Sequence, residues 1–408
     1  MTPIQKRTSP LVFLFVTVFV DMVGYGIVIP LLPFYAREYS STAVLVGILG
    51  SLYAAMQFFG GPVLGGLSDR VGRRPVLLFC LFGASGAYLL LGLAGTLWVL
   101  ILAVLLAGGA GATLATAQAY IADSTNPEDR AKGLGLIGAA FGLGLITGPA
   151  AGGLLSLHTL STPAFAASAI AFSNVLFGFF VLPESLPPDR KSRTPLTQLN
   201  PVSQLKEILR MDTIRPLLLV VFLLNLSFAG LLTNFPLFSN ARFGWDATSN
   251  AFFFAFVGVC AMLTQGLLIG YLQPRLKEWR LVLGGLSLVA VNLGLMAIVP
   301  YGFLLYPVVG ILAVGAALTI PSVTAIISRL VPRDSQGKLM GGIQAILSLT
   351  LILGPLIAGM SFDYIGVPAP YWIGGLLAAL ALLVAARTLL PSRTISEYST
   401  ASNEEKGA

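Results

Sequence analysis

Apolar runs of about 20 residues, separated by short polar stretches, recur along the whole chain and restrict what it can fold into. A helix of that length crosses the ~30 Å hydrocarbon layer of a bilayer and satisfies its backbone groups internally. Hydrophobic residues make up 56% of the 408 residues and charged residues 10%, too few charges to cover a soluble protein of this size. We therefore predict an all-α membrane protein with twelve transmembrane helices, at residues 11–34, 44–66, 76–95, 97–121, 133–156, 163–182, 214–238, 248–272, 279–300, 302–327, 338–362 and 369–390.

The basic residues of the loops fall almost entirely on one side of this topology. When successive loops are placed on alternate sides, only Arg37 and Arg242 among the 24 Lys and Arg residues lie opposite the others. Loops rich in Lys and Arg stay in the cytoplasm. We predict a multi-pass protein of the plasma (inner) membrane with both termini cytoplasmic. The net charge of +7 then reflects the topology, and no nucleic-acid partner is expected.

A polar stretch and a weak repeat divide the chain into two halves. The sequence Pro127-Glu128-Asp129 precedes a span that contains Gly148-Pro149, and Pro332-Arg333-Asp334 precedes one that contains Gly354-Pro355. Such parallel repeats are typical of transporters that bind their solute between two six-helix halves. The predicted organisation is a first half at 1–182, a cytoplasmic linker at 183–213, a second half at 214–390 and a cytoplasmic tail at 391–408.

The residues that usually build catalytic and metal centres are scarce. Cys80 and Cys260 both fall inside apolar runs, and His158 is the only histidine. No nucleotide-binding loop and no Ser, His and Asp set is present. We expect no disulfide, no metal, no cofactor and no enzymatic activity.

The loop between the second and third spans carries a specific pattern of charges and glycines, G-G-L-S-D-R-V-G-R-R-P at residues 65–75. It resembles the signature loop of the major facilitator superfamily, a cytoplasmic latch whose opening favours the inward-open state. The resemblance implies that Asp69 faces the N-terminus of the eleventh span and that Arg73 pairs with Asp123. A plain basic turn is the alternative. The latch residues are Gly65, Asp69, Arg70, Gly72, Arg73, Arg74 and Asp123.

The fifth span carries a series of glycines that resembles the antiporter motif of the same superfamily, which is associated with proton-driven export. Glycines at these spacings allow helices to approach closely, and the proline bends the helix. Packing by glycine without any link to transport is the alternative. The motif residues are Gly135, Gly144, Gly148, Pro149, Gly152 and Gly153.

The first span contains a carboxyl group, Asp21, roughly 15 Å inside the membrane. A charged residue at such a depth costs about 2.5–3.5 kcal/mol on insertion scales, so it should face the bundle interior and serve a function. Our hypothesis is that Asp21 binds and releases the coupling proton. The alternative is a structural Asp that bonds to the backbone near the helix-breaking Pro30.

Over nearly its full length the chain resembles the tetracycline-resistance and drug:proton antiporter branch, including F-G-W-D-A-T at 243–248 and the Gln336-Gly337 turn. It departs from that branch at two positions. The branch usually carries an Arg in the fourth span where this chain has Val104, and its tetracycline exporters carry an acid in the third span near Ala87. Metal–tetracycline is therefore not the expected substrate, and the counter-charge of Asp21 is missing.

Polar and aromatic side chains within the spans are the candidates for lining a substrate cavity. They are Tyr25, Tyr53, Gln57, Gln118, Asn225, Phe228 and Gln344; Gln265 is a further amide, and Asn292 is expected to pack between helices. One acid and several neutral amides suit a moderately apolar, neutral or cationic solute.

The favoured function is proton-coupled efflux of small amphiphilic organic compounds by a monomer, with the solute, protons and the lipid bilayer as its partners. The alternatives are a facilitator of a metabolite such as a sugar or amino acid, with no coupling or a different coupling, and a transporter-like sensor.

Overall fold

The computed structural model describes residues 10–39, 42–124, 127–186, 205–206, 208–272, 275–332 and 335–390. Within these residues the regular secondary structure is entirely helical. The first half contains α1 (Pro10–Val28), α2 (Leu32–Arg37), α3 (Ala43–Val71), α4 (Arg73–Gly92), α5 (Leu97–Gly109), α6 (Thr113–Ser124), α7 (Pro127–Ser156) and α8 (Thr162–Val181). The second contains α10 (Arg215–Phe228), α11 (Leu231–Phe243), α12 (Ala247–Leu263), α13 (Ile269–Leu272), α14 (Glu278–Ile298), α15 (Leu305–Arg329), α16 (Gln336–Tyr364) and α17 (Ala369–Leu389).

The helices coincide with the predicted spans. Ten helices in the described part of the chain are long and apolar enough to cross a membrane, and α10 with α11 forms an eleventh span bent by 41°. The remaining predicted span, the eighth at 248–272, is occupied by α12, a π-helical turn at Thr264–Leu268 and α13, which follow one another without a gap. The all-helical membrane fold is thus confirmed, with the first, fourth, seventh and eighth spans interrupted in ways that hydropathy does not show.

Local chemistry explains two of these interruptions. Between α1 and α2 a 3₁₀ turn at Ile29–Leu31 contains Pro30, which cannot donate a backbone hydrogen bond. Between α5 and α6 the break falls at residues 110–112, next to Gly108, Gly109 and Gly111. A continuous helix is weakest at such glycines.

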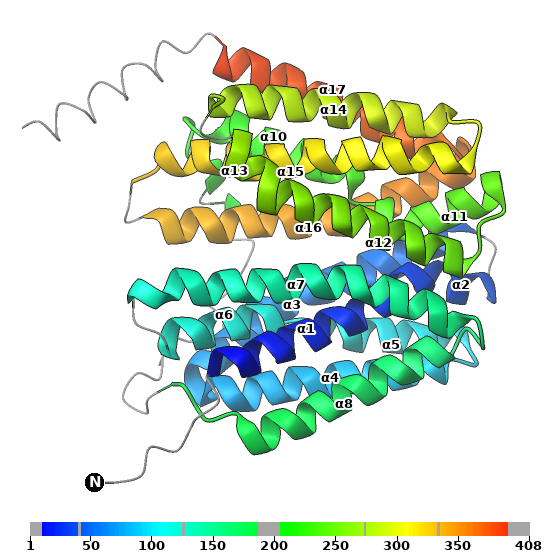
Figure 1. Cartoon of the computed structure of the whole chain (residues 1–408), viewed down its shortest axis with the longest axis vertical. Helices are drawn as coiled ribbons and strands as arrows, with labels where there is room; N and C mark the ends of the chain where they lie inside the picture. The colour runs from blue at the N-terminus through cyan, green and yellow to red at the C-terminus, as the bar shows by residue number, and fades with distance from the viewer. Residues whose placement is uncertain are drawn as a thin grey trace, which may run out of the picture.

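The helices form two stacked bundles, one from each half of the sequence (Figure 1). One core cluster draws all its buried residues from positions 208–389. The other clusters are built mainly from the first half; from the second half, Leu237 is buried in one of them, and Ala247 and Phe362 pack against it. Many large apolar side chains point outward, among them Trp98 and Phe180, each 79% exposed. Such an apolar exterior suits a lipid environment.

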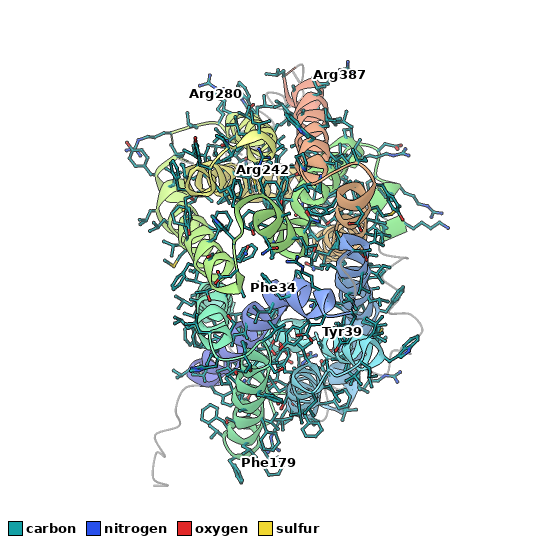
Figure 2. The ribbon with its side chains drawn as sticks, turned by 90° about the vertical axis from the view of Figure 1, so that its right-hand side faces the viewer. Phe34, Tyr39, Phe179, Arg242, Arg280 and Arg387 are labelled. Carbon is teal, nitrogen blue, oxygen red and sulfur yellow. The ribbon has the colours of Figure 1, made fainter. Side chains whose placement is uncertain are left out.

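The two bundles lie side by side, so the molecule has two ends along the helix axes. We call the end where α1 begins and α17 finishes the terminal end, and the opposite one, near α2 and α11, the distal end (Figure 1). Figure 2 looks onto the distal end, where Phe34 lies between the two bundles. The main contacts between the halves join α3 to α16 and α7 to α12.

The segment at 243–248 forms a tight turn at the distal end. Gly244 ends α11 with φ +70°, a left-handed conformation that favours glycine. Asp246 then caps α12 by accepting a 2.8 Å hydrogen bond from the Ser249 backbone N–H. Hydrogen bonds from Ser249 hold the pKa of the Asp246 carboxyl below its usual range. The turn therefore fixes the entry angle of α12.

Candidate functional site

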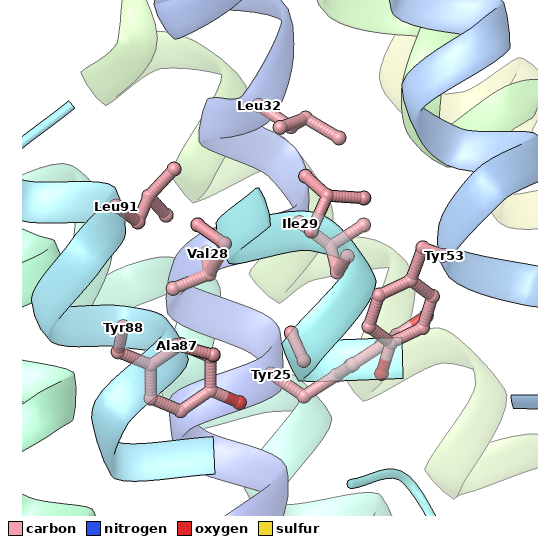
Figure 3. Close-up of a pocket in the computed structure, with 11 residues that line it drawn as sticks. Tyr25, Val28, Ile29, Leu32, Tyr53, Ala87, Tyr88 and Leu91 are labelled. Atoms are coloured by element: carbon pink, nitrogen blue, oxygen red, sulfur yellow. The ribbon is translucent and has the colours of Figure 1, made fainter. Parts of the chain in front are cut away.

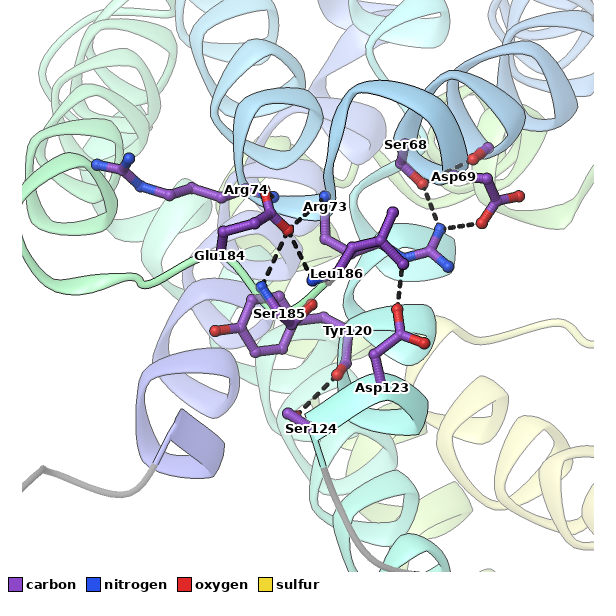
Figure 4. Close-up of polar contacts among 11 residues, drawn as sticks. Ser68, Asp69, Arg73, Arg74, Tyr120, Asp123, Ser124, Glu184, Ser185 and Leu186 are labelled. Atoms are coloured by element: carbon purple, nitrogen blue, oxygen red, sulfur yellow. Dashed lines mark hydrogen bonds and ion pairs between the residues drawn. The ribbon is translucent and has the colours of Figure 1, made fainter. Parts of the chain in front are cut away.

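The loop at 65–75 is built around the buried guanidinium of Arg73 (Figure 4). Its Nε donates to Asp123 Oδ2 at 2.8 Å, and one Nη donates to Ser68 Oγ at 2.7 Å. The same Nη forms an ion pair with Asp69, and Ser68 Oγ donates to Gly65 O at 2.6 Å. Arg73 thereby ties the start of α4 to the end of α3 and the end of α6.

The resemblance implied a different partner for Asp69. In the part of the chain that the structure describes, no hydrogen bond joins Asp69 to the first turn of α16, and its ion-pair partner is Arg73. Contact between Asp69 and the eleventh span stays a prediction for another conformation. Arg70 lies beside this cluster on α3.

Sequence reasoning missed Glu184, which follows α8 and completes the cluster. Its carboxylate accepts hydrogen bonds from the backbone N–H groups of Arg73 at 2.9 Å and Arg74 at 3.2 Å. Those groups open α4, so Glu184 caps that helix from 110 residues away. Gly72 has φ +132°, and a Cβ there would overlap the Glu184 carboxylate. Arg74 in turn donates to Phe179 O at 2.6 Å. Since no local pattern links residues so distant, no sequence signal was available.

The glycines of α7 divide into an unobstructed group and a closely packed group. A Cβ at Gly135 would meet no described atom within 4 Å. Farther along, Gly144, Gly148 and Gly152 pack against α1, and Gly153 packs against α12. Pro149 contacts α1 as well, since its Cδ would lie 2.9 Å from a Cβ at Gly26. Only the distal part of the motif therefore serves close helix packing here.

Two alanine substitutions in α7 are expected to have different effects on stability, one destabilising and the other not. A Cβ at Gly148 would lie 2.7 Å from Val23 O and 2.8 Å from Gly26 Cα, both backbone atoms that cannot move aside. Gly148→Ala should destabilise the protein by about 1–3 kcal/mol. Gly142→Ala, where a Cβ meets no described atom within 4 Å, should be neutral or stabilising by up to ~1 kcal/mol. Thermal unfolding of the purified variants measures both, and equal effects would contradict the packing argument.

Asp21 lies on α1 and is partly buried. The buried Thr113 side chain, at the start of α6, lies beside its carboxyl group. Tyr88 of α4 packs against α1 near Asp21, because a Cβ at Gly24 would lie 2.8 Å from the Tyr88 ring. The carboxyl group thus sits where α1 meets the break in the fourth span.

A small cavity of about 20 Å³, room for about one water molecule, lies next to this region (Figure 3). Tyr25, Tyr53 and Tyr88 line it from three helices, and the rings of Tyr25 and Tyr53 are 5.8 Å apart. Ala87 and Val104 line the same cavity. The two departures from the related branch therefore coincide in space, and an apolar wall replaces the expected charges.

The remaining cavity candidates do not line this small cavity. Gln57 Nε2 donates to Gly111 O at 3.4 Å, and Asn225 Nδ2 donates to Val221 O within its own helix at 2.8 Å. Gln118 and Gln344 are exposed, and Phe228 lines a separate cavity in the second half. Asn292 is buried and bonds within α14, as a packing residue would. The Gln265 side chain lies outside the described part of the structure.

The cavity beside Phe228 contains polar groups that sequence reasoning did not single out. It measures about 30 Å³ and lies at the bend between α10 and α11. Asn234 and Tyr371, each 3% exposed, line it. Neither amide atom of Asn234 nor the Tyr371 hydroxyl has a hydrogen-bond partner among the described residues.

Across all residues that the structure describes, no three His, Cys, Asp or Glu side chains gather as a metal site would require.

Comparison with known proteins identifies the family. The model of the Major Facilitator Superfamily matches residues 14–318 and 293–407. The chain belongs to this superfamily. It is 39% identical to the class C tetracycline resistance protein of Escherichia coli, over 86% of this chain and 89% of that protein. It is 35% identical to the class D protein of Salmonella ordonez over 92% and 97%, and 28% identical to multidrug resistance protein 2 of Bacillus subtilis over 93% and 95%.

Solved structures of this superfamily share the fold. The nucleoside transporter NupG superimposes with a TM-score of 0.79 at 13% identity, over 93% of this chain and 100% of that one. The human organic anion transporter MFSD10 gives 0.70 at 23% identity, over 94% and 100%. This major facilitator protein is therefore a multi-pass membrane transporter related to tetracycline and multidrug resistance proteins.

Proposed function

We propose that the protein exports small amphiphilic organic compounds in exchange for protons. The main support for this proposal is sequence similarity over most of the chain to tetracycline and multidrug resistance proteins. It is supported by Asp21, an acid within the first span, and by the glycine pattern of α7. The apolar wall at Ala87 and Val104 favours a solute that needs no buried charge to bind it.

The transport cycle we propose alternates access between the two halves, with the solute bound where they meet. At the distal end the halves touch: Ser51 Oγ donates to Ile352 O at 2.5 Å, and Thr248 Oγ1 to Gly153 O at 3.3 Å. Toward the terminal end a Cβ at Gly65 or Gly138 would meet no described atom within 4 Å. This difference supports a conformation open at the terminal end. Protonation of Asp21 would accompany the switch to the other conformation.

We infer that the terminal end faces the cytoplasm, because among the described residues every Lys and Arg except Arg37 and Arg242 lies toward it. The distal end is then external, both termini are cytoplasmic, and the linker at 183–213 and the tail at 391–408 are cytoplasmic too. Residues 187–204, 207 and 391–408 lie outside the described structure. A monomer with two six-helix halves suffices for the cycle.

A facilitator of a metabolite such as a sugar or amino acid is the second candidate, favoured by Val104 where an antiporter of this branch would carry an Arg. Inside-out membrane vesicles distinguish the two. Accumulation of a fluorescent amphiphilic cation that a protonophore abolishes supports the exporter. Equilibration that ignores the protonophore supports the facilitator and overturns the exporter.

A further inference from the structure

Helices α3 and α16 make the most extensive contact between the halves, and their glycines approach the other helix closely in the distal parts. A Cβ at Gly47 would overlap the Pro355 carbonyl, and one at Gly359 would overlap the carbonyl of Ala43. Beyond this region, Gly61 and Gly65 of α3 have no described atom within 4 Å of a Cβ. The distal part of this helix pair is therefore the closed part of the molecule.

At the distal tip of the pair, a carboxylate from one half caps a helix of the other. Asp363 Oδ1 accepts a 3.0 Å hydrogen bond from the Ala43 backbone N–H, and Oδ2 accepts a 2.8 Å bond from that of Val44. These N–H groups open α3. Thr42, the residue before the helix, makes no side-chain cap hydrogen bond. The acid of the second half therefore performs the task that an N-cap residue would normally perform.

The same two helices carry a second acid at the other end. α3 and α16 run antiparallel, and Asp69 lies near the terminal end of α3 just as Asp363 lies near the distal end of α16. In this structure the distal carboxylate is bonded across the halves, while Asp69 pairs with Arg73 in its own half. Among the described residues, a carboxylate therefore fastens this helix pair across the halves at its distal end, and the Asp69 carboxylate forms no such bond at the other end.

We propose that Asp363 is the clasp of the external gate, which holds the distal end closed by capping α3 and must release it when the protein opens outward. The clasp rests on the alternating-access cycle proposed above and on neither the solute nor the coupling ion. Removing the carboxylate deletes two charge-assisted hydrogen bonds to an N-terminus. We expect the ratio of distal-open to distal-closed molecules to rise about tenfold.

Distances between spin labels measure this ratio without any solute. Cys80 and Cys260 are first replaced by Ala, and labels are attached at His158→Cys and Phe303→Cys, exposed distal positions in different halves. In the Asp363→Ala protein the long-distance population should grow about tenfold relative to the short one, and by less in Asp363→Asn, whose amide oxygen still accepts one bond. Glu38→Gln is the matched control, because it removes a charge from an exposed residue at the same end.

A local cap separates the clasp from a merely structural role. In an Asp363→Ala, Thr42→Asp protein, α3 regains an acid at its N-terminus but no bond between the halves. Thermal stability should recover while the distal end stays open. An unchanged distance distribution in Asp363→Ala and Asp363→Asn would overturn the clasp, as would an equal shift in Glu38→Gln or closure restored by Thr42→Asp. Failure to transport any solute, with these distance changes intact, would contradict the proposed export but not the clasp.

Discussion

Replacing Asp21 with Asn is expected to lower solute transport driven by a pH gradient by roughly 100-fold or more, as for the loss of an essential proton-transfer group. The amide has nearly the same shape and can still face Thr113, which lies beside the acid in this structure. It cannot release a proton, so the cycle loses its coupling while the solute site stays intact. Exchange of labelled for unlabelled solute, which needs no net proton movement, should persist.

The measurement compares gradient-driven uptake with solute exchange in proteoliposomes at matched protein density. Asp21→Glu, which keeps a carboxyl group on a longer side chain, should retain part of the gradient-driven uptake. Full coupling in Asp21→Asn would remove this residue from the proton pathway and leave it the structural role at the helix break. Loss of exchange together with uptake would indicate damage to the solute site instead.

Replacing Arg73 with Ala should destabilise the protein by about 3–5 kcal/mol, the usual result of deleting one partner of a buried ion pair. The Arg73 side chain is 10% exposed, and its removal leaves Asp123, itself 21% exposed, without its partner. Arg215→Ala provides a matched control: that arginine also pairs with an aspartate, Asp212, but the side chains are 67% and 92% exposed. Its loss should cost about 0–1 kcal/mol.

Thermal unfolding of the purified proteins in one detergent ranks these variants. The unfolding temperature of Arg73→Lys should lie between those of the parent and Arg73→Ala. An ammonium group keeps the charge, but it lacks the planar set of N–H donors with which the guanidinium bonds to Ser68, Asp69 and Asp123. Similar losses in Arg73→Ala and Arg215→Ala would show that the cluster is an ordinary surface turn.

The fold was predictable because the thickness of the bilayer sets the length of a spanning helix, so each apolar run of about 20 residues marks one helix. Every predicted span is occupied by a helix or by consecutive helical segments. The breaks were less visible. Pro30 could be recognised as a helix breaker, whereas the π-helical turn at Thr264–Leu268 has no proline. The turn contacts α15, which is distant from it in the sequence.

The site was predictable only where the pattern was local. The loop at 65–75 could be read from consecutive residues, but Glu184 and Asp363 contact helix starts that lie far away in the chain. Polar residues such as Gln118 and Gln344 were candidates by type alone; both are exposed and neither lines the cavity beside Tyr25 and Tyr53, so their part in solute binding stays a prediction. Burial and convergence are properties of the folded chain, and a single sequence does not contain them.

Proton movement in liposomes that contain only this protein tests the proposed function most directly. With no initial pH gradient, an amphiphilic solute loaded inside is allowed to flow out, and the internal pH is followed with a trapped dye. The account predicts that the liposome interior acidifies as the solute leaves, and that Asp21→Asn liposomes stay at constant pH. Solute efflux with no change of internal pH in the parent protein would contradict proton-coupled export.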